Sequence, residues 1–98
     1  MPVSLTTRER AKLKARAHAL APVVQIGHAG LSDTVVKEVE RALTAHELIK
    51  VRILGDDRDR RVALGDALCE RTNAALVQRV GKIIALFRPK PEEPEDGE

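Results

Sequence analysis

The stretch PVVQIGHAGLSDTVVKEVERALTAHELIKVRIL, residues 22–54, predicts a strand, a helix and a second strand in that order. Residues 22–26 are short and rich in β-branched side chains, which favours a buried strand. Residues 48–54 alternate between apolar and basic side chains, which is typical of a half-buried strand. The helix is expected over 31–46, where Ser32 can cap the first turn and one face is apolar: Leu31, Val35, Val36, Val39, Ala42 and Leu43. Such a unit requires parallel pairing through a right-handed crossover.

A helix is also expected before this unit, over residues 4–20. Thr6 and Glu9 have the spacing of a capping box, in which each residue binds the other's backbone N–H. Pro22 ends the helix, because the residue before a proline is pushed out of the helical region. The apolar stripe of this helix is narrow: Leu13, Ala17 and Leu20.

The rest of the chain predicts one more helix and a hairpin. The helix runs from about 58 to 72 and buries Val62, Leu64, Leu68 and Cys69. Strands over 75–80 and 83–88 are separated by Gly81-Lys82, and a two-residue loop with glycine first suits a type II′ hairpin turn. The expected order is α-β-α-β-α-β-β, an α/β fold with a four-stranded mixed sheet packed with three helices.

Composition limits the class of protein. The 98 residues suffice for one domain, and 43% hydrophobic against 33% charged residues favours a water-soluble chain. The longest hydrophobic run is the five residues 83–87, far short of the roughly 20 that a membrane span needs. No signal peptide is recognisable, and one cysteine excludes a disulfide framework and a multi-cysteine zinc site. We therefore expect a cytoplasmic protein that does not act at a membrane.

The net charge of +2 hides an asymmetry between the body and the C-terminus. Residues 89–98 carry a net charge of −4 and three prolines, whereas residues 1–88 carry +6. The expected domain is therefore 1–88, followed by a disordered acidic tail over 89–98. A basic body suggests an anionic partner, and solubility alone is the alternative explanation.

Nothing in the sequence indicates an enzyme. It contains no nucleophile elbow, no zinc-protease helix and no P-loop. His18, His28 and His46 are spread along the chain, and Cys69 is expected in the core. We predict no catalytic residues, no metal site, no cofactor and no small-molecule substrate.

Phosphate binding is better supported. Gly27-His28-Ala29-Gly30 is a G-x-x-G loop that joins a strand to a capped helix. The two glycines allow close approach of an anion, and the helix N-terminus presents unpaired N–H groups. One aromatic residue, Phe87, is too few for stacking on bases, so contacts with a nucleic acid would be made by charges and backbone groups.

Basic side chains are expected to support the loop. They lie on both flanks of the first helix, on one face of the second strand, in the hairpin turn and at the end of the last strand. The expected contacts are Arg8, Lys12, Lys14, Arg16, Lys50, Arg52, Lys82 and Arg88. A solvated basic face without a ligand is the alternative.

Three blocks together resemble a known family: residues 22–32, 46–52 and 80–89. The chain resembles the CRM domain (chloroplast RNA splicing and ribosome maturation) in its stand-alone bacterial YhbY-like form, over about residues 4–89. The resemblance implies a fold similar to the C-terminal domain of translation initiation factor three. It also implies binding of rRNA in precursors of the large ribosomal subunit, with Gly27, His28, Ala29 and Gly30 as RNA contacts.

We therefore expect an RNA-binding protein that aids ribosome assembly and has no enzymatic activity. The loop would hold a phosphate, while the first helix, Lys50 and Arg52 would neutralise neighbouring phosphates. The alternative is a protein-interaction module of the ribosome or translation machinery without a direct RNA role.

Overall fold

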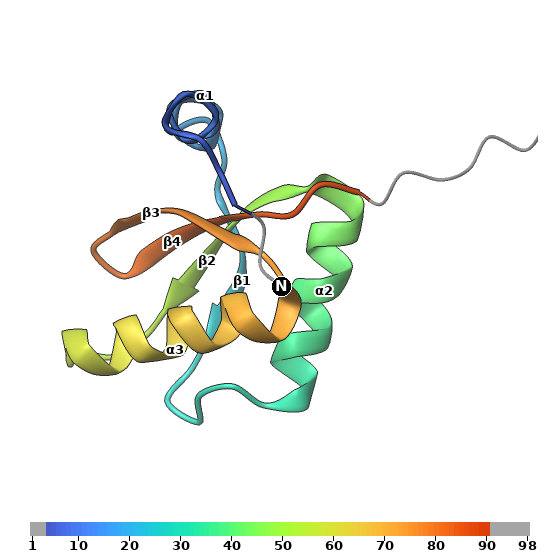
Figure 1. The fold of residues 1–98 in the computed structure, drawn as a ribbon. Coiled ribbons are helices and arrows are strands. Elements are labelled where there is room, and N and C mark those ends of the chain that lie inside the picture. The colour runs from blue at the N-terminus through green and yellow to red at the C-terminus, as the bar shows by residue number, and fades with distance from the viewer. Residues whose placement is uncertain (1–3, 91–98) are drawn as a thin grey trace, which may run out of the picture.

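Seven elements follow one another in the predicted order over residues 4–90, the part of the chain that the computed structural model describes. Their order confirms the α-β-α-β-α-β-β prediction. In Figure 1, α1 lies on one side of the sheet, and α2 and α3 lie on the other. The bounds are α1 (Thr7–Ala17), β1 (Pro22–Ile26), α2 (Asp33–His46), β2 (Leu48–Ile53), α3 (Arg58–Thr72), β3 (Ala75–Val80) and β4 (Ile83–Phe87).

The four strands form one mixed sheet in the order β1-β2-β4-β3. β1 pairs with β2 in parallel, as predicted, and β4 pairs antiparallel with both β2 and β3. β2, α3 and β3 form a second strand–helix–strand unit, whose two strands run parallel but do not pair directly because β4 lies between them. Three consecutive residues of β4, Ile84, Ala85 and Leu86, are buried, so the strand is covered on both faces and belongs in the middle of the sheet.

Two hydrophobic clusters hold the layers together. The larger lies between the sheet and the helices α2 and α3, and includes Ile26, Leu43, Ile53, Leu68 and Leu86. The smaller lies under α1: Leu13, Ala17, Leu48, Val77 and Ala85. One end of the other sheet face is therefore also covered, which explains why β2 buries both of its first two residues.

The helix starts follow the predicted caps. The Thr6 hydroxyl accepts from the Glu9 N–H at 3.0 Å, and the Glu9 carboxylate accepts from the Thr6 N–H at 2.9 Å. This hydrogen bond from the Thr6 backbone lowers the pKa of Glu9. The Ser32 hydroxyl accepts from the Val35 N–H at 3.1 Å.

Two details of the prediction are wrong. The helix expected over 4–20 is too long at both ends, and Leu20 is 38% exposed in the turn after α1, outside the apolar stripe. β1 is an edge strand, so it is buried on one face only and Val23 is 54% exposed.

The hairpin turn agrees with the prediction, since Gly81 has φ +59° and Lys82 does not share the positive φ. Among the described residues, none of the helices has the length and apolar character needed to cross a bilayer.

The acidic tail prediction falls almost wholly on residues 91–98, which lie outside the described part of the chain.

Candidate functional site

The G-x-x-G loop connects the carboxyl end of β1 to the N-terminus of α2. The Gly30 N–H donates to the Gly27 carbonyl at 3.1 Å, which closes the loop on itself. Gly30 has φ +82°, a conformation that side chains with a Cβ rarely adopt, whereas a Cβ on Gly27 would meet nothing within 4 Å. Ser32 accepts from the N–H groups of Val35 and Val36, so the first-turn N–H groups of α2 without a partner within the helix are those of Asp33 and Thr34. The loop and this helix end together offer backbone donors to an anion.

A side chain of α3 supports the loop. The Arg60 guanidinium donates from Nη2 to the His28 carbonyl at 2.8 Å, and the same nitrogen lies 3.7 Å from the position of a Cβ on Gly30. Arg60 therefore brings a positive charge to a loop that has no lysine or arginine of its own. This contact was not predicted from the sequence. The sequence signal is the run RDRR over 58–61, directly after Asp57, whose carboxylate caps α3 through the Arg60 N–H.

The hairpin turn meets the same end of the sheet. The Ile53 N–H donates to the Lys82 carbonyl at 2.7 Å, and Lys82 forms an ion pair with Asp56 at 3.3 Å. The Leu54 N–H donates to the Ile26 carbonyl at 2.9 Å, so the ends of β1, β2 and the hairpin lie together. We call residues 27–30, 58–61 and 81–82 the loop edge. It contains the predicted loop and Lys82 together with three arginines that were not predicted.

The basic residues of α1 lie away from the loop edge. Arg8, Lys12, Lys14 and Arg16 are exposed on α1, across the sheet from α2 and α3, whereas the loop lies on the side of α2 and α3 (Figure 1). The fifth basic residue, Arg10, donates to the backbone carbonyls of Leu76 and Val77. α1 and the loop edge therefore lie on opposite sides of the sheet, and the contact of α1 with RNA stays a prediction.

Lys50 and Arg52 lie on the sheet face that α1 shares. Lys50 pairs with Ala85, which packs under α1, and Arg52 pairs with Ile83 two residues further on. Lys50 is half-buried and lines a shallow groove together with His18, whereas Arg52 is exposed. These two residues continue the basic surface of α1 across the uncovered half of the sheet.

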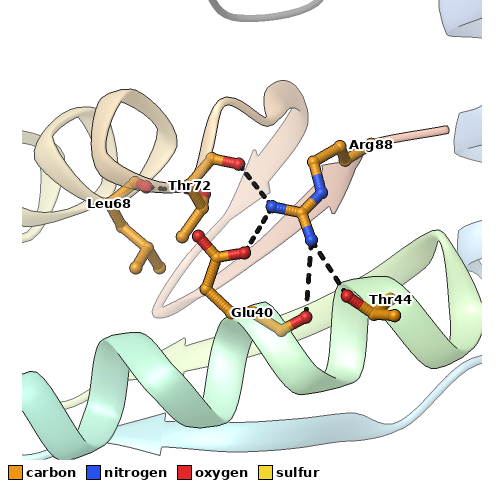
Figure 2. Close-up of polar contacts among 5 residues, drawn as sticks. All are labelled: Glu40, Thr44, Leu68, Thr72 and Arg88. Carbon is orange, nitrogen blue, oxygen red and sulfur yellow. Dashed lines mark hydrogen bonds and ion pairs between the residues drawn. The ribbon is translucent and has the colours of Figure 1, made fainter. Parts of the chain in front are cut away.

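Arg88 is half-buried against α2 and the end of α3 (Figure 2). Its Nη1 donates to the Glu40 carboxylate at 2.5 Å and to the Thr72 carbonyl at 2.8 Å, and its Nη2 donates to the Thr44 hydroxyl at 3.2 Å. These contacts connect the end of β4 to α2 and to the C-terminus of α3. The prediction that Arg88 contacts RNA stays a prediction, and its internal contacts do not favour it, so we leave it out of the candidate surface.

The remaining reactive side chains do not form a site. Within residues 4–90, no three side chains of the metal-ligating types come together. Cys69 is buried in the core, where desolvation raises the pKa of its thiol to about 11. The thiol is therefore protonated at neutral pH and is a poor nucleophile.

The fold and the loop edge define a small α/β domain in which a glycine loop joins a strand to a capped helix. A family model for the CRS1/YhbY (CRM) domain matches residues 5–88. The chain belongs to this family.

Relatives from several bacteria match over almost their full length. The chain is 44% identical to an RNA-binding protein of Haemophilus influenzae over 89 residues, covering 91% of this chain and 90% of that one. It is 40% identical to Probable RNA-binding protein PA4753 of Pseudomonas aeruginosa, covering 91% and 86% of the two chains. The solution structure of hypothetical protein SAV1595 from Staphylococcus aureus, described as a candidate RNA binding protein, superposes with a TM-score of 0.80 at 34% identity. That match covers 94% of this chain and 96% of the other.

Proposed function

We propose that this chain binds RNA and aids assembly of the large ribosomal subunit in the cytoplasm, acting by binding and without catalysis. The observation that carries the proposal is the glycine loop with φ +82° at Gly30, supported by the Arg60 guanidinium at 2.8 Å from the His28 carbonyl. RNA-binding relatives that match nine-tenths of the chain support the choice of RNA as the anion.

The proposed contacts are to phosphates. The loop and Arg60 would hold the RNA backbone at the loop edge. On the other side of the sheet, a second basic surface would contact another RNA segment: Arg8, Lys12, Lys14, Arg16, Lys50 and Arg52. Since Phe87 is the chain's one aromatic residue and is half-buried, the protein would recognise RNA shape.

A protein partner on the ribosome is the second candidate function. Leu20 and Val23 are 38% and 54% exposed and line one hollow next to the end of α1. Two exposed apolar side chains in a hollow suit a protein contact better than a phosphate.

Sedimentation of cell extract on a sucrose gradient, with and without ribonuclease, tests the proposal. We expect the protein in precursor large-subunit fractions and its release by ribonuclease. A protein that stays in the soluble fractions contradicts the assembly role, and one that remains on the particles after ribonuclease supports the second candidate.

Binding to rRNA fragments in solution then tests the two surfaces separately. Arg60→Gln removes the charge at the loop, and the pair Lys12→Glu with Arg16→Glu reverses charge on α1. Arg41→Gln, on an exposed position of α2, is the matched control. For every phosphate that a variant no longer binds, the slope of log affinity against log salt should flatten by about 0.7 to 0.9. Affinities equal to the control for both surfaces would show that RNA binds elsewhere on the protein.

A further inference from the structure

A pocket of about 290 Å³ opens between the first two turns of α3 and the β3–β4 hairpin. Four of its lining side chains are cations, Arg58, Arg61, Arg79 and Lys82, and its floor includes Ile53 and Ile84. We call it the hairpin pocket. Arg58, Arg61 and Lys82 belong to the loop edge, but no residue of the glycine loop 27–30 lines the pocket.

The pocket has more positive charge than its internal partners neutralise. Arg79 pairs with Asp66 at 2.5 Å, and Lys82 pairs with Asp56, whose side chain is fully exposed. Arg61 has only a backbone carbonyl as its acceptor, that of Gly55 at 2.7 Å. The Arg58 side chain has no hydrogen bond or ion pair with any residue in 4–90. The four cations therefore have two carboxylate partners, and both of these are exposed to solvent.

Two of these guanidinium groups also hold buried donors without an acceptor. Arg61 Nε and Arg79 Nη1 are buried within residues 4–90 and have no hydrogen-bond partner there. Buried polar groups in proteins are nearly always paired, and a guanidinium favours an acceptor with the charge and geometry of a carboxylate or a phosphate. An anion in the pocket would offset the charge of Arg61, which has no carboxylate partner, and would lie beside both unpartnered donors.

A glycine in α3, Gly65, leaves room for the Arg79 guanidinium. A Cβ on Gly65 would lie 3.0 Å from Arg79 Nη1, closer than nearly all such contacts, so glycine at this point lets the guanidinium lie against α3. Glycine inside a helix lowers its stability relative to alanine. The destabilising glycine therefore lies at the position where Arg79 packs against α3, beside the three other cations of the pocket.

The arginines at the N-terminus of α3 lie on two sides of the helix. Arg60 faces the glycine loop, and Arg58 and Arg61 line the hairpin pocket, so the N-terminus of α3 lies between the two places. The helix dipole adds a partial positive charge there.

We propose that the hairpin pocket binds a phosphate group of the bound RNA, as a second phosphate subsite beside the glycine loop. The inference rests on the proposed RNA function for the source of the phosphate. The ligand chemistry, a phosphate oxygen facing arginine and lysine, is common to an RNA backbone and to free phosphate, and the experiment separates these sources.

The test compares two double variants that each remove two positive charges. Arg58→Gln with Lys82→Gln changes the pocket, and Lys37→Gln with Arg41→Gln changes exposed positions on α2. Against one 5′-hydroxyl RNA, we expect the pocket variant to bind about ten-fold more weakly than the control, with the salt dependence flattened by about 0.7 to 0.9. Circular dichroism checks that both variants are folded.

The second arm follows the Arg61 Nε–Hε resonance by NMR, during titration with that RNA and with inorganic phosphate against chloride at constant ionic strength. A shift with the RNA that the pocket variant loses supports the proposal. If the RNA binds but the pocket variant equals the control and the resonance does not move, the pocket proposal is overturned and the RNA function stands. If no RNA binds, the RNA function fails. If the Arg61 resonance shifts to saturation with inorganic phosphate but does not move with the RNA, the pocket binds free phosphate and its RNA role is overturned.

Discussion

Replacing Arg88 by methionine should destabilise the fold and leave RNA binding unchanged. Methionine keeps the aliphatic stem but removes hydrogen bonds to the Thr72 carbonyl at 2.8 Å and the Glu40 carboxylate at 2.5 Å, with a longer one to Thr44. The arginine side chain is 21% exposed, so its charged hydrogen bond to the carbonyl is worth about 1.5 to 2 kcal/mol. Glu40 is 42% exposed, so solvent screening limits that pair to about 0.5 to 1 kcal/mol. The expected decrease in stability is about 2 to 3 kcal/mol.

Thermal and urea unfolding measure this decrease, and RNA titration provides the second readout. For a domain of this size, about 2 to 3 kcal/mol corresponds to a fall in Tm of about 10 to 20 °C. Arg88→Lys keeps the charge but loses the forked geometry, so its Tm should lie between those of the wild type and Arg88→Met. The reasoning is refuted if Arg88→Met changes stability by less than about 0.5 kcal/mol while RNA affinity drops and its salt dependence flattens. That result would make Arg88 the RNA contact that its position in the sequence suggested.

Three other substitutions or reactions separate function from folding. Gly27→Asp should weaken RNA binding with little change in Tm, because a Cβ there meets open space, whereas Gly30→Asp should lower both, because φ is +82°; equal effects of the two on affinity and on Tm would contradict this. Gly65→Ala should keep or raise Tm, since alanine favours the helix by about 0.5 to 1 kcal/mol, while displacing Arg79 and weakening RNA binding; wild-type affinity would show that the arginine's position is unimportant. The thiol of Cys69, with its pKa raised to about 11 by burial, should react with a disulfide reagent at pH 8 at least about 100-fold more slowly than in urea. Between pH 9 and 11 the thiol of the unfolded chain loses its proton while the buried thiol keeps it, so wild-type stability should fall relative to Cys69→Ala. Parallel stability profiles of the two proteins over this pH range would contradict the raised pKa.

Short-range patterns predicted the elements of this protein. Helical spacing of apolar residues located α2 and α3, Ser32 and Thr6 marked two helix starts, and the glycine of the Gly81-Lys82 pair identified the hairpin turn. These features depend on backbone geometry and on neighbours a few residues away, so the sequence is sufficient to recognise them. The G-x-x-G loop between a strand and a capped helix is local in the same sense.

The tertiary structure decided which elements meet. The packing of two layers placed α1 across the sheet from the loop, inserted β4 between β2 and β3, and brought Arg60 to the loop from a helix 32 positions further along. It also half-buried Arg88, which alternation and charge alone could not distinguish from an exposed basic residue. The sequence around a basic residue does not identify its partner. Which groups it meets depends on how apolar faces from distant parts of the chain pack together. The charges available to a ligand are those that the folded core leaves unpaired.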